Sequence, residues 1–311
     1  MSVTLPTRDK YFVNTKLKKI ALFIYDPIVD GKPLSEFMGW NDPMALVANY
    51  MDDMYEASRR TYKYELADVQ IINDVTTLED GFKYDTKTLR RVMSGLEKPH
   101  EPMMMDYEGF VREHMVNENI RDREWDEVWI MAYPYAGLWE STMGGPRAFW
   151  CNSSPMKETE QAEHRYVIMG FNFERGVGEM MEAFLHRAES IMFEVYRYHP
   201  PRLNMWQKFT RIEKTHPGES GVGTCHFAPN SVRDYDWGNP QKVMSSCRDW
   251  EYNYPNLTGA SDIVDCSEWG NGDIRLHHLW WLKHLPHWPR VTNGVFNNWW
   301  HYIMTPDWVK V

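Results

Sequence analysis

Four short apolar runs in the first 175 residues constrain the fold of this chain more than any other feature. They are rich in valine, isoleucine and aromatic residues, and they lie at residues 19–25, 64–75, 127–133 and 166–171. Most are continuous rather than alternating, as in strands that are buried on both faces of a sheet. Segments with helical periodicity separate them. This alternation predicts an α/β fold, with a doubly wound, mostly parallel sheet in a three-layer arrangement.

Helix signals occupy the gaps between these runs. Asp42 and Pro43 form a typical helix start, an N-cap followed by proline at the first helical position, and they precede the periodic segment 44–60. Two more helices are predicted at 86–94 and 105–117. A fourth follows the last strand, in the stretch NFERGVGEMMEAFLHRAES at 172–190.

The character of the chain changes near residue 200, where two consecutive prolines interrupt the last helix. Ten of the 15 tryptophans follow this point, among many Gly, Pro, Asn and Asp residues, and only 274–284 has a clear helical pattern. We therefore predict two parts. Residues 1–200 form the α/β domain, and residues 201–311 form a Trp-rich, loop-rich subdomain that caps the carboxyl edge of the sheet.

Charge and composition limit the partners. The 34 Lys and Arg residues against 44 Asp and Glu residues give a net charge of -10, which disfavours nucleic acid. No apolar run approaches the roughly 20 residues that cross a bilayer, and the N-terminus lacks the order of a secretory signal, so we expect a cytoplasmic protein and no membrane partner. The four cysteines form no C-x-x-C pair, and Cys247 and Cys266 are expected to join only in an oxidising compartment.

The carboxyl ends of the predicted strands mark the place where a ligand is expected. In open parallel sheets the binding crevice lies beyond these ends. Tyr135 follows the third run, and Asn172, Glu174 and Arg175 follow the fourth. We therefore predict Tyr135 and Asn172 as substrate-binding residues, and Glu174 and Arg175 as catalytic residues.

The helix that follows the fourth run carries an ionisable stripe. At about 100° per residue, five side chains share an arc of about 80°, namely those of Arg175, Glu179, Glu182, His186 and Glu189. A solvated amphipathic helix gives a similar pattern. However, Phe193 falls in the same arc, which favours a partly covered face. A covered face with three glutamates requires a positive charge, a proton or a metal.

The spacing of this stripe is suited to a divalent cation, with zinc as the first candidate. Glu182, His186 and Glu189 offer nitrogen and oxygen ligands from one helix and leave positions for water. A distant histidine would complete the set, and His226 is the best candidate because glycines in its short loop allow close approach. His284 and His287 come next. No nucleotide cofactor is expected, because RGVGEM is not G-x-G-x-x-G and Glu179 would repel a phosphate.

These patterns favour a hydrolase that acts on a small-molecule, glycan- or peptide-like substrate, with Glu179 as a further catalytic candidate. The first alternative is a metal-free glycoside hydrolase, in which Glu174 or Glu182 pairs with an acid of the C-terminal part. The candidate acids lie beside tryptophans, and they are Asp234, Asp236 and Glu268. Trp237 and Trp269 would stack against sugar rings. The second alternative is a non-catalytic carbohydrate-binding protein that uses the same groups. The third is a protein whose polar helix face is only solvated.

Overall fold

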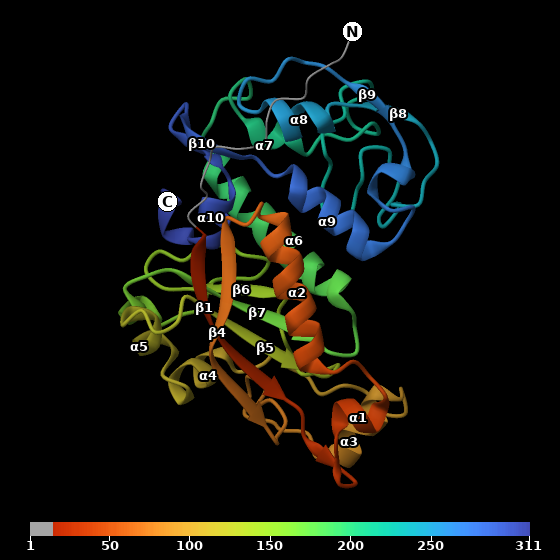
Figure 1. The fold of residues 1–311 in the computed structure, drawn as a ribbon. Helices are drawn as coiled ribbons and strands as arrows, with labels where there is room; N and C mark the ends of the chain where they lie inside the picture. Colours follow the sequence, from red (N-terminus) through yellow and green to blue (C-terminus); the bar gives the residue numbers. More distant parts are fainter. Residues whose placement is uncertain (1–14) are drawn as a thin grey trace.

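The computed structural model describes residues 15–311, and a five-stranded sheet lies at its centre (Figure 1). The strand order is β4-β1-β5-β7-β6. Four strands are parallel, namely β1 (Lys16–Tyr25), β4 (Tyr62–Ile72), β5 (Glu127–Ala132) and β7 (Tyr166–Asn172), and β6 (Ser141–Gly144) is antiparallel to β7. The four predicted apolar runs are thus the four parallel strands, and the predicted α/β class is confirmed.

Helices flank this sheet on both faces. Tyr50 of α2 (Pro43–Ala57) packs on Trp129 of β5, with ring centroids 5.2 Å apart. Phe23 of β1 faces the other way and packs on Phe110 of α4 (Tyr107–Glu113) at 5.0 Å. The predicted helix at 105–117 is interrupted after α4, because Met115 adopts a left-handed conformation before α5 (Val116–Arg121) begins. The shorter helices α1 (Leu34–Met38) and α3 (Thr86–Met93) and the hairpin β2 (Ile28–Val29) and β3 (Lys32–Pro33) lie beyond the carboxyl ends of β1 and β4 (Figure 1).

The longest helix, α6 (Val177–Tyr196), follows β7 and connects the sheet to the C-terminal part. Its apolar face is fully buried, and α9 (Ile274–His284) packs along it. Gly178 allows this contact, because a Cβ atom there would lie 2.6 Å from Cγ2 of Ile274. The remaining C-terminal elements are α7 (Met205–Phe209), β8 (Val243–Ser245), α8 (Cys247–Asn253), β9 (Asp262–Val264), β10 (His287–Thr292), β11 (Val295–Asn298) and α10 (Trp300–Met304).

Aromatic side chains form the core of the C-terminal part. Trp299 is fully buried, and the rings of Trp206, Phe209, Trp250 and Tyr254 lie within 6 Å of it. The tryptophan-rich composition therefore supplies core packing in this region. The cluster is continuous with the core of the sheet through α6.

The position of the C-terminal part differs from our prediction. Tyr62, at the amino end of β4, has its hydroxyl 2.7 Å from Nδ1 of His301, and Arg165, just before β7, donates to the carbonyl of Val309 at 2.7 Å. The C-terminal segment therefore packs at the amino ends of the strands, not over their carboxyl edge. The reason is topological, because α6 starts at the carboxyl edge and returns along the sheet before the chain continues.

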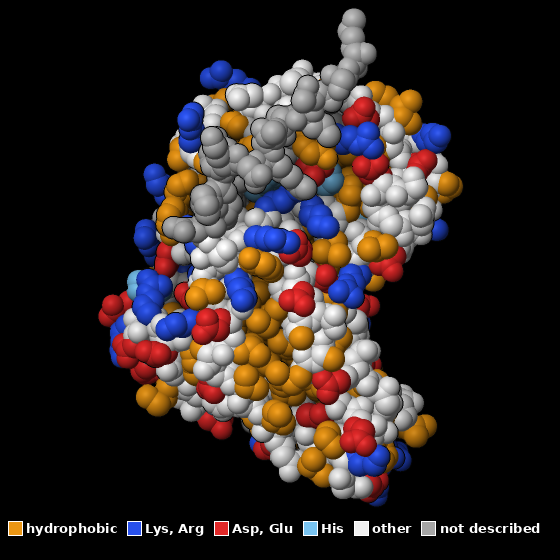
Figure 2. Space-filling model, in the orientation of Figure 1, with side chains coloured by type: hydrophobic (Ala, Val, Ile, Leu, Met, Phe, Trp, Pro, Cys, Tyr) orange, Lys and Arg blue, Asp and Glu red, His pale blue; other side chains and the backbone are white. Residues whose placement is uncertain are grey.

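Two further sequence expectations concern cysteines and membranes. All four cysteines are buried free thiols, so Cys247 and Cys266 are not joined. Among residues 15–311, no helix is both long enough and apolar enough to cross a bilayer. On the face drawn in Figure 2, acidic and basic side chains are interspersed, and hydrophobic side chains gather near β4, where Val69 and Ile71 are exposed.

Candidate functional site

The ionisable stripe of α6 lies at the centre of the candidate site. The helix begins after Gly176, whose backbone N–H donates to Oε2 of Glu179 at 3.0 Å. Glu182, His186 and Glu189 follow on one side of α6, as the 3.6-residue period predicts. Phe193 is 61% exposed, so it does not mark a covered face as we expected from the sequence. The covered part of the stripe is its middle, where Glu182 is buried.

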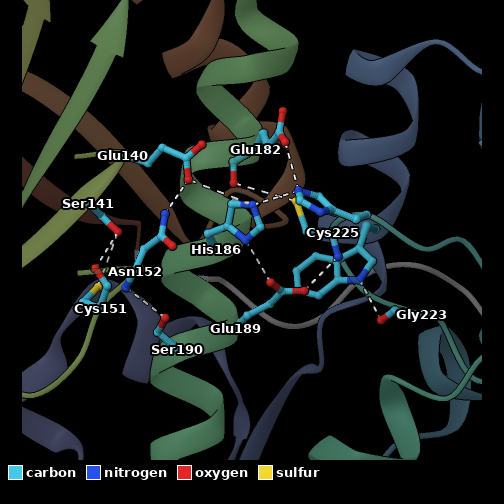
Figure 3. A network of polar contacts seen from close by, with 12 residues as sticks. Glu140, Ser141, Cys151, Asn152, Glu182, His186, Glu189, Ser190, Gly223 and Cys225 are labelled. Atoms are coloured by element: carbon cyan, nitrogen blue, oxygen red, sulfur yellow. Dashed lines mark hydrogen bonds and ion pairs between the residues drawn. The ribbon is translucent and has the colours of Figure 1, made fainter. Parts of the chain in front are cut away.

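A tight loop from the C-terminal part covers this middle section. Gly223 has a φ of +88°, and a Cβ atom there would lie 2.1 Å from the carbonyl oxygen of Phe227, so the turn requires glycine. The carbonyl of Gly223 accepts a hydrogen bond from the indole of buried Trp281 at 3.1 Å. This anchored turn places Cys225 against α6 (Figure 3). His226, the next residue, contacts Glu182 of the same helix.

Two histidines and one glutamate meet where the loop contacts α6. Nε2 of His226 lies 3.1 Å from Nε2 of His186 and 3.1 Å from Oε1 of Glu182. Sγ of Cys225 belongs to the same group, in which one ligand atom from each residue lies within 4.8 Å of the others. The hydroxyl of Tyr235 completes the rim, at 3.0 Å from Oε1 of Glu182 and 3.2 Å from Nε2 of His226. We call Glu182, His186 and His226 the Glu–His–His cluster.

Carboxylates behind the rings of His186 and His226 favour the tautomer in which Nδ1 carries the proton. Nδ1 of His186 lies 3.1 Å from Oε2 of Glu189, and an ionised carboxylate can only accept, so this nitrogen carries the proton. Oδ1 of Asp234 lies 3.6 Å from Nδ1 of His226 and favours the same tautomer there. A proton on Nε2 of His226 would be donated to Glu182, whereas neutral rings that both carry the proton on Nδ1 would turn both Nε2 lone pairs toward each other and toward the carboxylate of Glu182. Such an arrangement requires a cation or a proton between the three groups.

The ionisation of the cluster reflects this concentration of negative charge. Burial disfavours a charged His186, but the hydrogen bond and charge of Glu189, with the charges of Glu140 and Glu182, outweigh it and raise the pKa of His186. Burial opposes ionisation of Glu182 as well, yet hydrogen bonds from His226 and Tyr235 lower the pKa of that carboxyl. Burial and the neighbouring glutamates raise the pKa of the Cys225 thiol well above its ordinary value.

Two cavities border the Glu–His–His cluster, each of about 370 Å³. The first, which we call the sheet-edge cavity, lies at the carboxyl ends of β5 and β7 and includes Tyr135, Glu140, Asn172, Arg175, Glu179 and Glu182 in its lining. The second, the aromatic cavity, is lined by His186, Glu189, Phe193, Trp206, His226 and Phe227, with Thr210 and Thr224. The cluster therefore lies at the boundary between the two cavities.

Several residues predicted from the sequence are brought together here. Glu182, His186 and His226 converge, and Glu189 contacts His186 but on the side of the ring that faces away from the other two. Oε1 of Glu189 also accepts from the backbone N–H of Cys225 at 2.8 Å. Glu189 thus orients a histidine and the loop, which is different from the ligand role that we predicted for it. Asp234 similarly lies behind His226.

Other predicted residues lie outside the cluster. Glu174 is absent from the lining of both cavities and forms an ion pair with Arg175 at 3.8 Å, and Glu268 pairs with Arg248 at 2.9 Å on the C-terminal part. Arg175 precedes α6, and its guanidinium pairs with Glu174.

Trp237 and Trp269 are also outside the two cavities. Both rings are buried, and the indole of Trp269 donates to the carbonyl of Trp237 at 2.8 Å. Neither has a free face on which a sugar could stack. The two side chains contribute to core packing instead.

Three residues at the site were not among our sequence predictions. Cys225 and Tyr235 immediately neighbour predicted residues, in the stretches TCHF and DYDW. Glu140 comes from the segment between β5 and β6. Its Oε2 atom accepts a hydrogen bond from Nδ2 of Asn152 and lies 4.0 Å from Nε2 of His186. Figure 3 shows Glu140 and Asn152 approaching His186 from the side opposite Cys225. The polar segment after the third apolar run was the only sequence signal for Glu140.

Comparisons with known proteins give no family for this arrangement. No protein-family model matches the chain, and neither the curated proteins nor the solved structures compared with it give a significant match.

Proposed function

We propose that this chain is a hydrolase that binds one divalent cation, with zinc preferred, at the Glu–His–His cluster. One observation carries the proposal, namely that Nε2 of His226 lies 3.1 Å from Nε2 of His186 and 3.1 Å from Oε1 of Glu182, so that three possible metal ligands meet at one place. A bound cation removes the repulsion between these groups. Three ligands from the protein leave one position for water, which is typical of catalytic zinc sites, whereas structural sites have four protein ligands.

The spacing of the ligand atoms fits a zinc ion. Zinc–ligand distances of about 2.0–2.1 Å in a tetrahedron separate the ligand atoms by about 3.3 Å. Nε2 of His226 lies 3.1 Å from both of the other ligand atoms, so binding requires only small movements. Glu189 and Asp234 lie behind the two histidines, as second carboxylates do in many zinc sites, where they orient the ring and increase its basicity.

The groups around the cluster are suited to hydrolysis of a carbonyl compound. When bound, zinc polarises a substrate carbonyl and lowers the pKa of a water molecule. Glu140, oriented by Asn152, would accept the proton of the attacking water. Partial burial, followed by the charge of Glu182, raises the pKa of Tyr235 to about 12, so this hydroxyl stays protonated and can donate to the developing oxyanion. Asn172 and Arg175 would bind polar groups of the substrate in the sheet-edge cavity.

Metal binding is tested by substitution of His186. We expect one zinc per chain by elemental analysis, and a stabilisation of about 2.7 kcal/mol at a free zinc concentration one hundred times the dissociation constant. The H186A variant should lose both, because it removes a ligand. H216A is the matched control, since His216 is exposed and lies outside both cavities, and it should behave as the wild type. A wild-type protein that binds no zinc would refute the proposal.

Hydrolysis is tested separately from metal binding through Glu140. The E140Q variant keeps the size of the side chain but cannot accept a proton, so we expect zinc binding to persist and kcat to fall about 10²- to 10⁴-fold. E174Q is the control, because Glu174 is outside the cavities, and its kcat should remain close to the wild-type value. Zinc-independent binding of an oligosaccharide without turnover would instead favour a carbohydrate-binding protein.

A further inference from the structure

The two cavities favour a substrate that is long enough to occupy both of them. The Glu–His–His cluster contributes to both linings, with Glu182 in the sheet-edge cavity and His186 and His226 in the aromatic cavity. A bond that reacts at the cluster therefore has free space on both of its sides. A small molecule would fill one cavity and leave the other empty.

Helix α6 forms a common wall along this space. Glu179 lines the sheet-edge cavity and Phe193 lines the aromatic cavity. At 1.5 Å of rise per residue, the fourteen positions between them span about 21 Å. An extended peptide covers this distance with about six residues.

The lining of both cavities favours apolar side groups. Met103, Leu138 and Met180 border the sheet-edge cavity. In the aromatic cavity, the ring of Phe193 is largely exposed and lies with Phe227 beside the cluster. Apolar groups gain from such contacts.

The charges around the sheet-edge cavity disfavour acidic substrates. Glu140, Glu179 and Glu182 line it, against a single positive charge on Arg175. Arg175 is itself paired with Glu174 outside the cavity. A chain with neutral or basic groups is therefore favoured on this side of the cluster.

We propose that the substrate is an extended, non-acidic, peptide-like chain that lies along α6 and places one apolar side group in each cavity. The inference rests on the proposed hydrolase function, because it places the reacting amide at the cluster. In this reaction the oxygen of water bonds to the carbonyl carbon and the C–N bond breaks. The leaving nitrogen takes up a proton, so that the products are a carboxylate and an amine.

Calorimetric titration of the zinc-loaded protein tests the proposal without turnover. The probe is a capped, uncharged hexapeptide in which an uncleavable ketomethylene unit replaces the amide between a central leucine and a phenylalanine, and each half of it is titrated separately. Because only the full ligand occupies both cavities, we expect it to bind at least about tenfold more tightly than either half. The F193A variant should weaken binding of the full ligand and of one half by about tenfold, and leave the other half unchanged.

Y198A is the matched control, because Tyr198 is an exposed aromatic residue near the end of α6 that lines neither cavity. It should bind all three ligands as the wild type does. A half-ligand that binds as tightly as the full peptide would overturn the proposal in favour of a small-molecule site. Tighter binding of a β-1,4-linked N-acetylglucosamine hexamer than of the full peptide would overturn it in favour of a glycan.

Failure of this inference can be distinguished from failure of the proposed function. Zinc stoichiometry and the effect of E140Q on kcat report on the hydrolase, whereas the titration reports on ligand binding across the two cavities. The titration is also repeated on metal-free protein, so it tests whether one ligand occupies both cavities even if zinc does not bind. Equal affinity for the full ligand and its halves, in both the zinc-loaded and the metal-free protein, would refute a substrate that spans the two cavities and would leave the proposed metal site untouched.

Discussion

At the scale of single residues, Cys225 would determine which kind of zinc site the proposed metal ligands form. Its buried thiol lies within 4.8 Å of the three proposed ligands, but it points to the carbonyl of Glu182 at 3.9 Å, and burial raises the pKa of this thiol in the metal-free protein. As a fourth ligand, Cys225 would close the coordination sphere, as in structural sites. As a thiol beside the site, it would leave the position for water open.

Cobalt substitution and the C225A variant separate these two cases. For an open site we expect no thiolate-to-cobalt charge-transfer band in the wild-type protein, and a zinc affinity in C225A within about tenfold of the wild-type value. C151A is the control, since Cys151 is equally buried but does not belong to the group of possible ligands that contains Cys225. A charge-transfer band that disappears in C225A together with zinc binding would identify a closed, structural site.

At the scale of helices and strands, the contact between α6 and α9 supports the site, because both histidines depend on the position of α6 and its covering loop. Gly178 permits this contact. In an isolated helix, alanine is about 1 kcal/mol more favourable than glycine. Here we expect G178A to destabilise the fold by about 1–3 kcal/mol, because the added methyl overlaps with Ile274.

A double-mutant cycle in urea unfolding checks this expectation. In the G178A/I274A variant the overlap with the Ile274 side chain is removed and the 3.1 Å contact with the backbone nitrogen of Arg275 remains, so G178A should cost less in the I274A background than in the wild type. Equal costs in both backgrounds would show that the side chain of Ile274 does not constrain Gly178. Stabilisation by G178A alone would show that helix propensity outweighs packing at this position.

Some of these helices and strands are predictable from the sequence, and others, like the contacts between distant residues, are not. Strands such as β1 were predictable because burial on both faces leaves a continuous apolar run, and the stripe of α6 was predictable from its period. Strand β6 (STMG) has no such signature. The partners of Glu182 lie more than 40 residues away along the chain, so they depend on the path of a loop. A glycine-rich turn indicated His226, but no local pattern indicated Tyr235.

At the scale of the whole molecule, buried histidines make stability sensitive to acid. Six histidines have lowered pKa values, and burial is the largest cause for each of them, namely His114, His277, His278, His284, His287 and His301. The pKa of His278 is lowered to about 3, and those of His287 and His301 to about 4. In the unfolded chain these rings take up protons near pH 6.5. The unfolded state therefore binds more protons, and the free energy of unfolding falls as the pH decreases.

Urea unfolding between pH 7 and pH 4.5, in the presence of a chelator, measures this dependence. Each extra proton bound by the unfolded state contributes a slope of about 1.4 kcal/mol per pH unit, and we expect a slope equivalent to several protons below pH 6.5. The H278Q variant should reduce it by about one proton, because it removes a group that is neutral only in the folded state. H216Q should leave it unchanged, since His216 is exposed. A slope of less than one proton would mean that the histidines of the folded protein titrate in this range, so that the Trp-rich part is open to water.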